Sequence, residues 1–128
     1  MEYSTLIPEL IVSDIEKTYV FYVDLLGFQV EYERPEDKFY FLSYGDAQLM
    51  IEEASEEELS QLIYPFGYGL NFSLGVDDVS ATYQAFQTAG YPIRRELEVR
   101  EFRVGDDVVR PKEFAVLDPD GYYWRISD

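Results

Sequence analysis

The sequence contains two copies of one pattern, and this internal repeat constrains the fold more than any other feature. Six residues of the first half recur, identical or chemically similar, 64 positions later. The first set is Val12, Asp14, Ile15, Thr18, Tyr19 and Tyr22, and the second set is Val76, Asp78, Val79, Thr82, Tyr83 and Phe86. Gly27 and Gly90 continue the match at a spacing of 63, one residue less. Such a repeat predicts two similar structural units.

Each copy predicts a strand, then a capped helix, then further strands. Asp14 and Asp78 stand where a carboxylate can accept the unpaired N–H groups of a first helical turn. Apolar residues follow at helical spacing, and Gly27 and Gly90 suit the C-terminal cap. The strands predicted after the two helices are 28–33, 38–44 and 47–53, then 91–97, 99–104, 112–117 and 122–127. Each half is therefore predicted to be a βαβββ module, with one additional strand segment in the second half.

The length fits one domain made of these two modules. At 128 residues and 15.0 kDa, the chain has the commonest domain size. We expect a single domain, 1–128, with module 1 at about 4–54, a connector at about 55–67 and module 2 at about 68–128. A short helix is predicted at 55–62, because three glutamates open it. The turn-forming residues of 103–112 predict a longer loop, with no counterpart in the first half.

Composition excludes several classes of function. The formal charge of −16 opposes binding to a nucleic-acid backbone. The chain has no cysteine and no histidine, so thiolate chemistry, imidazole bases and nitrogen metal ligands are absent. No apolar run approaches the ~20 residues of a membrane span, and no leader pattern opens the chain. We expect a soluble, cytoplasmic protein without nucleic-acid or membrane partners.

The motifs resemble the vicinal oxygen chelate superfamily of glyoxalases, bleomycin resistance proteins and extradiol dioxygenases. The residues that carry the resemblance are Ile11-Val12-Ser13-Asp14, Phe21-Tyr22 with Leu26-Gly27-Phe28, Val76-Asp77-Asp78-Val79, and the run Glu113–Gly121. The resemblance implies an α+β fold in which two βαβββ modules form a cupped mixed sheet. It also implies a small-molecule ligand inside the cup and a homodimer.

Enzymes of this superfamily generally hold a divalent metal with His and Glu side chains, and the resemblance gives four positions for them. The first-strand positions, seven residues before each capping Asp, fall on Ile7 and Asn71. The last-strand positions, four residues after each turn glycine, fall on Leu49 and Arg125. Alkyl groups and a cation cannot ligate Mg²⁺, Zn²⁺ or Fe²⁺. We therefore expect no metal and no cofactor.

Strand alternation then predicts which side chains face the cup. Counted from the four positions above, the predicted ligand-binding residues are Glu9, Leu49, Ile51, Asn71, Ser73, Tyr123 and Arg125. Glu9 can pair either with a cationic ligand or with Arg125. Trp124 is expected to pack under a helix, and the Asp118-Pro119-Asp120-Gly121 run is interpreted as a tight turn.

The leading hypothesis is a metal-free binding protein of the bleomycin-resistance type, which sequesters a cationic or aromatic, bleomycin-like ligand without chemistry. Its sequence basis is an acidic chain with 12 Tyr and 9 Phe, together with the Glu113–Gly121 run, which is similar to that group. The alternative is a metal-independent lyase or isomerase, with Glu9 or Glu53 as a carboxylate base. Exposed sheet edges and the many aromatic residues predict a homodimer.

Overall fold

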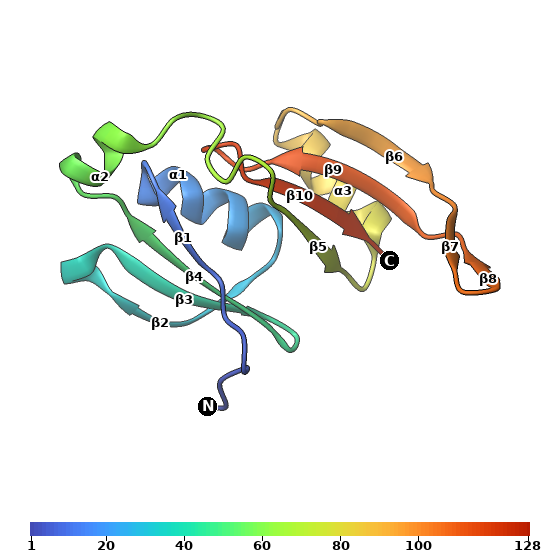
Figure 1. The fold of residues 1–128 in the computed structure, drawn as a ribbon, viewed down its shortest axis with the longest axis horizontal. Coiled ribbons are helices and arrows are strands. Elements are labelled where there is room, and N and C mark those ends of the chain that lie inside the picture. Colours follow the sequence, from blue (N-terminus) through green and yellow to red (C-terminus); the bar gives the residue numbers. More distant parts are fainter. The chain divides into compact units, whose positions relative to one another are not determined.

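The computed structural model describes all 128 residues and divides them into two compact units, Met1–Tyr64 and Pro65–Asp128. Figure 1 shows the same arrangement in both: a four-stranded sheet with a helix along one face. The two βαβββ modules predicted from the repeat are confirmed.

Unit 1 is a mixed sheet with the strand order β1-β4-β3-β2. Its elements are β1 (Glu9–Val12), α1 (Ile15–Tyr19), the π-helix η1 (Val20–Leu25), β2 (Gln29–Arg34), the 3-10 helix η2 (Pro35–Asp37), β3 (Phe39–Tyr44), β4 (Ala47–Glu53) and α2 (Glu56–Gln61). The pair β1–β4 is parallel, and the other two pairs are antiparallel. Ser55 and Glu58 form a capping box at the start of α2, as expected for the short connector helix.

The core of unit 1 lies between its sheet and the α1–η1 helix. Leu10 and Val12 of β1 are buried on the face that also carries Leu49 and Ile51 of β4, because the register pairs Leu10 with Ile51. Phe21 and Tyr22 of η1 are at most 1% exposed. We call the opposite side of each sheet, away from the helix of its own unit, the open face.

The first helix explains the uneven spacing of the repeat. Between Asp14 and Gly27 the chain has one residue more than between Asp78 and Gly90. The structure takes up this residue by widening the helix into η1, where the N–H of Leu26 donates to the carbonyl of Phe21 five residues earlier, at 2.9 Å. The corresponding helix of the second repeat, α3 (Val79–Thr88), is α-helical throughout and is capped by Asp78.

Unit 2 repeats the topology of unit 1, with the strand order β5-β10-β9-β6. Besides α3, its elements are β5 (Asn71–Gly75), β6 (Arg95–Val99), β7 (Phe102–Val104), β8 (Asp107–Val109), β9 (Lys112–Leu117) and β10 (Tyr123–Ser127). The prediction of a long loop at 103–112 is wrong, because β7 and β8 pair there as a separate two-stranded hairpin. The tight turn at Gly105 supplies the positive φ of this hairpin, +62°.

The core of unit 2 lies between α3 and its sheet. Phe86 of α3 and Phe114 of β9 are both fully buried, with ring centroids 5.7 Å apart. Trp124 is buried and stacks on Phe72 at 4.7 Å, as expected for a residue packed under the helix. The carboxylate of Asp118 accepts the N–H groups of Asp120 and Tyr122, which confirms the tight turn. No helix is long and apolar enough to cross a membrane.

Gly67 gives a direct test of the packing that starts unit 2. Its φ is +68°, and a Cβ at this position would lie 2.6 Å from Cδ1 of Tyr122. Gly67→Ala is expected to lower the free energy of unfolding by about 1–3 kcal/mol, from backbone strain and a ring clash together. The matched control is Gly69→Ala, with a φ of +90° and open space around it. Urea unfolding of both variants measures the difference, and equal losses would contradict the clash with Tyr122.

Candidate functional site

The register of β4 shows that two of the predicted ligand-binding residues lie on the wrong face of the sheet for that role. Leu49 and Ile51 are 2% and 0% exposed and lie on the helix side of the sheet. The prediction from alternation was wrong because residues 47–51 include apolar side chains on both faces. The sequence pattern therefore does not show which of these side chains face the helix. In the second module, Arg125 lies opposite Ser73 of the first strand. In the first module, the residue in the corresponding position is Met50, which lies opposite Glu9.

The open face of unit 1 is acidic beside β1 and β4. Glu9, Met50 and Glu52 lie on this face, and Glu53 points to the other side, as alternation requires. Burial, reinforced by the nearby charge of Glu9, raises the pKa of Glu52 above its ordinary value of 4.5. Two neighbouring carboxylates of this kind favour a cation over an anion.

Aromatic rings cover the rest of the open face of unit 1. Tyr32 stacks on Phe41 with ring centroids 5.1 Å apart, and Tyr3 meets Phe41 edge-on at 5.4 Å. The guanidinium of Arg34 lies 3.8 Å from the ring centroid of Phe39. As a result, Phe39 and Phe41 are each only 1% exposed. Side chains of unit 1 itself therefore cover both faces of β3.

The open face of unit 2 carries the other predicted residues. Asn71 pairs with Tyr123, and Ser73 pairs with Arg125. All four side chains lie on the side of the sheet that faces away from the buried Trp124. Of the two partners considered for Glu9, Arg125 has a carboxylate partner in its own unit. Its Nε and Nη2 donate to the two oxygens of Glu113 at 3.0 and 3.1 Å, and this pairing raises the pKa of Arg125.

These positions do not fit a divalent metal. In unit 1 they hold Ile7 and the thioether of Met50, and in unit 2 they hold the amide of Asn71 and the guanidinium of Arg125. Hard divalent cations need carboxylate or imidazole donors, and a guanidinium has no free lone pair. The structure also contains no group of three or more acidic side chains arranged to hold a metal ion.

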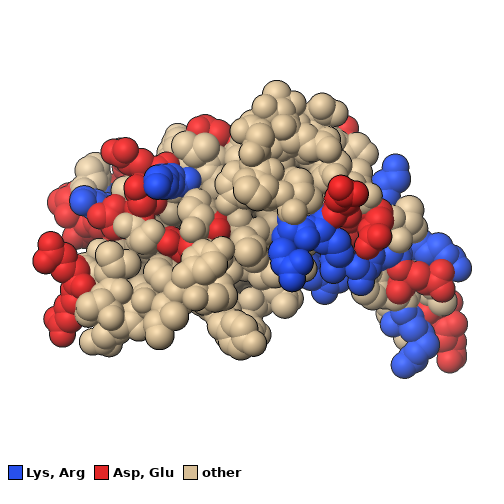
Figure 2. Space-filling model, turned by 90° about the horizontal axis from the view of Figure 1, so that it is seen from above, with Lys and Arg blue, Asp and Glu red and all other residues tan.

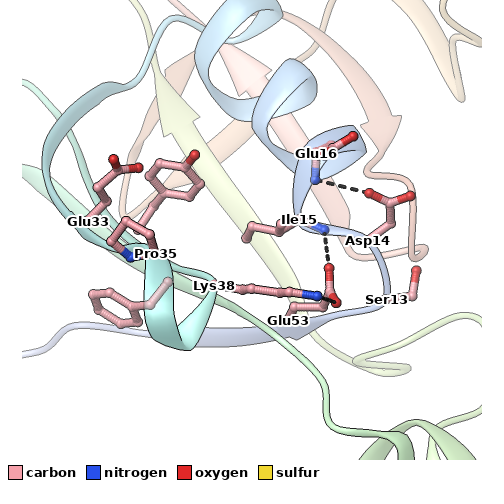
Figure 3. Close-up of a pocket in the computed structure, with 10 residues that line it drawn as sticks. Ser13, Asp14, Ile15, Glu16, Glu33, Pro35, Lys38 and Glu53 are labelled. Carbon is pink, nitrogen blue, oxygen red and sulfur yellow. Dashed lines mark hydrogen bonds and ion pairs between the residues drawn. The ribbon is translucent and has the colours of Figure 1, made fainter.

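A pocket of about 590 Å³ opens on the helix side of unit 1, a site that the sequence did not indicate (Figure 3). Its walls come from the start of α1, the end of β2, η2, β3 and the last residue of β4. Glu33 and Glu16 stand on opposite sides of it, and Lys38 reaches across to Glu53 (Figure 3). The volume is within the usual range for a small-molecule site.

Lys38 and Glu53 form the fixed part of this pocket. Lys38 has a left-handed backbone, with a φ of 49°, and its Nζ donates to Glu53 Oε1 at 2.9 Å. Glu53 Oε2 accepts the N–H of Ile15 at 3.0 Å, at the first residue of α1. These two hydrogen bonds, led by that from Ile15, lower the pKa of Glu53, so its carboxylate is a weaker base than an ordinary glutamate. No sequence pattern marks this pairing, because 14 residues separate the partners.

Comparison with known proteins identifies the family. The model of the glyoxalase/bleomycin resistance protein/dioxygenase superfamily matches residues 6–126. The chain belongs to this superfamily. The chain is similar to a lactoylglutathione lyase of Haemophilus influenzae, 34% identical over 124 residues that cover 87% of this chain and 82% of the relative.

Solved structures are also similar to this chain. The crystal structure of SMU.1112c is 30% identical, covers 98% of each chain and has a TM-score of 0.66. A superfamily protein from Alicyclobacillus acidocaldarius is 19% identical, with a TM-score of 0.69, and covers 97% of this chain and 89% of its own. The second likeness supports the fold alone. Membership in the superfamily is thus confirmed, and the narrower assignment to bleomycin resistance proteins stays a prediction.

Glu53 offers a test of how the pocket is held. Glu53→Gln is expected to lower the free energy of unfolding at pH 7 by about 1 kcal/mol, because the N–H of Ile15 loses a charged acceptor. Since the folded-state pKa of Glu53 is lowered, its contribution is complete above pH 4.5 and is lost as pH falls through the folded value. The difference between variant and wild type should therefore shrink in acid.

The control is Glu96→Gln, which removes the same charge from an exposed position on β6. Denaturant unfolding at several pH values compares the three proteins. A difference between Glu53→Gln and wild type that stays constant down to the acid limit would contradict the proposed role of the ionised carboxylate.

Proposed function

We propose that the protein is a metal-free small-molecule binding protein of the bleomycin-resistance type, which holds a cationic or aromatic ligand without chemistry. One observation carries the proposal. In a chain that matches the superfamily over almost its full length, the positions that would hold the metal are an alkyl group, a thioether, an amide and a guanidinium. The lyase activity named for the Haemophilus influenzae relative is not proposed for this chain.

The electrostatics of unit 1 support a cationic ligand. Residues 1–64 carry 15 acidic and three basic side chains, and Figure 2 shows clusters of acidic groups on the surface. Glu9 and Glu52 place two of these charges on the open face, beside Tyr32, whose ring stacks on the buried Phe41. A planar cation gains from such carboxylates and from ring faces together.

Titration with bleomycin by isothermal calorimetry tests the proposal. We expect saturable binding to the metal-free protein, with affinity reduced about tenfold in Glu9→Gln through loss of one charge-assisted contact. Glu96→Gln should bind like wild type. A loss in Glu33→Gln, with none in Glu9→Gln, would place the ligand in the helix-side pocket instead.

Two outcomes would contradict the proposal itself. One is the absence of heat and of thermal stabilisation with every bleomycin-class glycopeptide tried. The other is lactoylglutathione lyase activity that appears when Zn²⁺, Ni²⁺ or Mn²⁺ is added and disappears with a chelator.

A metal-independent enzyme remains the second candidate, and Glu52 is the observation in its favour. The raised pKa of Glu52 suits a general base better than the lowered pKa of Glu53 does. Glu9 stands on the neighbouring strand, diagonal to Glu52. In this alternative, Glu52 would remove a proton from the bound molecule, and the role first considered for Glu53 would pass to Glu52.

We also propose the homodimer. Large apolar side chains such as Leu6, Ile63 and Tyr68 are more than 80% exposed, which favours a further covering surface. Light scattering in moderate salt should give about twice the 15.0 kDa of one chain, with the dimer weakening as salt is removed because like charges then repel. A mass of one chain at micromolar concentration would contradict it.

A further inference from the structure

The open face of unit 2 carries two arginines that share one buried carboxylate. Arg125 of β10, Glu113 of β9 and Arg95 of β6 lie on three adjacent strands. Glu113 is the buried member, with 4% of its side chain exposed, whereas Arg125 and Arg95 keep 33% and 30%. We call these three residues the Arg–Glu–Arg cluster.

The register sets the two arginines at the same level. Both Arg125 and Arg95 lie opposite Ala115, one on each side of β9. Their Cα atoms are therefore about two strand spacings, or roughly 10 Å, apart. Ala115, between them, has only a methyl side chain, so the group of β9 that lies between the two guanidinium groups is the carboxylate of Glu113.

The hydrogen bonds of the cluster leave donors unused. Arg125 donates from Nε and Nη2 to Glu113, and Arg95 donates from Nη2 to Glu113 Oε1 at 2.7 Å. The Nε of Arg95 is buried and has no hydrogen-bond partner, and Glu98 Oε1 lies 3.9 Å from it. A buried donor without an acceptor is costly and uncommon in folded proteins.

The charge of the cluster is positive in an otherwise acidic chain. Glu98 pairs with both Arg95 and Arg100, so three arginines and two carboxylates meet here and leave one net positive charge. Seven of the ten basic side chains lie within 94–128. Figure 2 shows a patch of adjoining basic groups with acidic groups against it. Arg125 is also held from the side, because its guanidinium lies 5.3 Å from the ring centroid of Phe102.

We infer that the Arg–Glu–Arg cluster is a binding site for the carboxylate of a small molecule. Glu113 fixes the two guanidinium groups, and the exposed N–H groups that it leaves unused take the two oxygens of the ligand. A single net positive charge matches a monoanion, and the repulsion of a chain with a charge of −16 disfavours a dianion such as phosphate. This inference does not rest on the proposed function, because it concerns unit 2 alone and a ligand group of opposite charge.

Benzoate is the probe, with neutral benzamide and inorganic phosphate as comparisons. Calorimetric titration in a low-salt Tris chloride buffer should show benzoate binding with a Kd of roughly 1 mM, as expected for a ligand of this size. Benzamide should not bind, and phosphate should bind more weakly than benzoate. Added salt should weaken the binding of benzoate.

Arg95→Gln tests the cluster, and Arg110→Gln is its matched control. The first variant should weaken benzoate binding about tenfold. The second removes the same charge from an exposed arginine, paired with Glu101, outside the cluster, and should stay within about twofold of wild type. Arg95→Lys keeps the charge but loses the paired donors, so it should resemble Arg95→Gln.

A readout in the wild-type protein guards against a variant that fails to fold. The Nε–H resonance of Arg95 in ¹⁵N-resolved spectra should shift on addition of benzoate, with the same Kd as calorimetry. The inference is overturned if benzoate does not bind, if benzamide binds equally well, or if Arg95→Gln binds like wild type. Tighter binding of phosphate than of benzoate, with the same loss in Arg95→Gln, would overturn the assignment to a carboxylate. None of these outcomes bears on bleomycin binding to unit 1.

Discussion

In each unit a single helix packs on a four-stranded sheet, and the apolar side chains at alternate strand positions fill the space between them. One helix covers only one face. The side chains of the other face are therefore left without a core and must meet water, a ligand, another chain or one another. The two units answer this constraint differently. Unit 1 places carboxylates and stacked rings on its open face, whereas unit 2 places two guanidinium groups around a buried glutamate.

The sequence predicted the fold well because the repeat and the helix caps are local signals. Asp14 and Asp78 each begin a helix, and Trp124 lies under α3 as its alternation with Arg125 required. The candidate site was harder to predict. Leu49 and Ile51 were placed on the wrong face because Met50, between them, is also apolar, and only pairing with β1 sets the phase of β4.

Other features depend on contacts between residues that are distant in sequence. Lys38 and Glu53 meet only because η2 ends in a left-handed residue beside the last residue of β4. Arg95 and Arg125 reach the same level through pairing with a third strand, β9. Neither arrangement leaves a periodic pattern in the sequence, since each depends on register and not on spacing along one strand.

The π-helix η1 has a consequence for how the two halves have diverged. One residue inserted into an α-helix rotates every later side chain by about 100° around the axis. Without the wide turn, the extra residue would have rotated Leu26, which is buried, and the glycine after it away from their present positions. A single wide turn accommodates the inserted residue within η1. The side chains of β2 therefore face the same sides of the sheet as those of the corresponding strand in the other half. The duplicated module thus tolerates a change in length without a change in which face its later strands present.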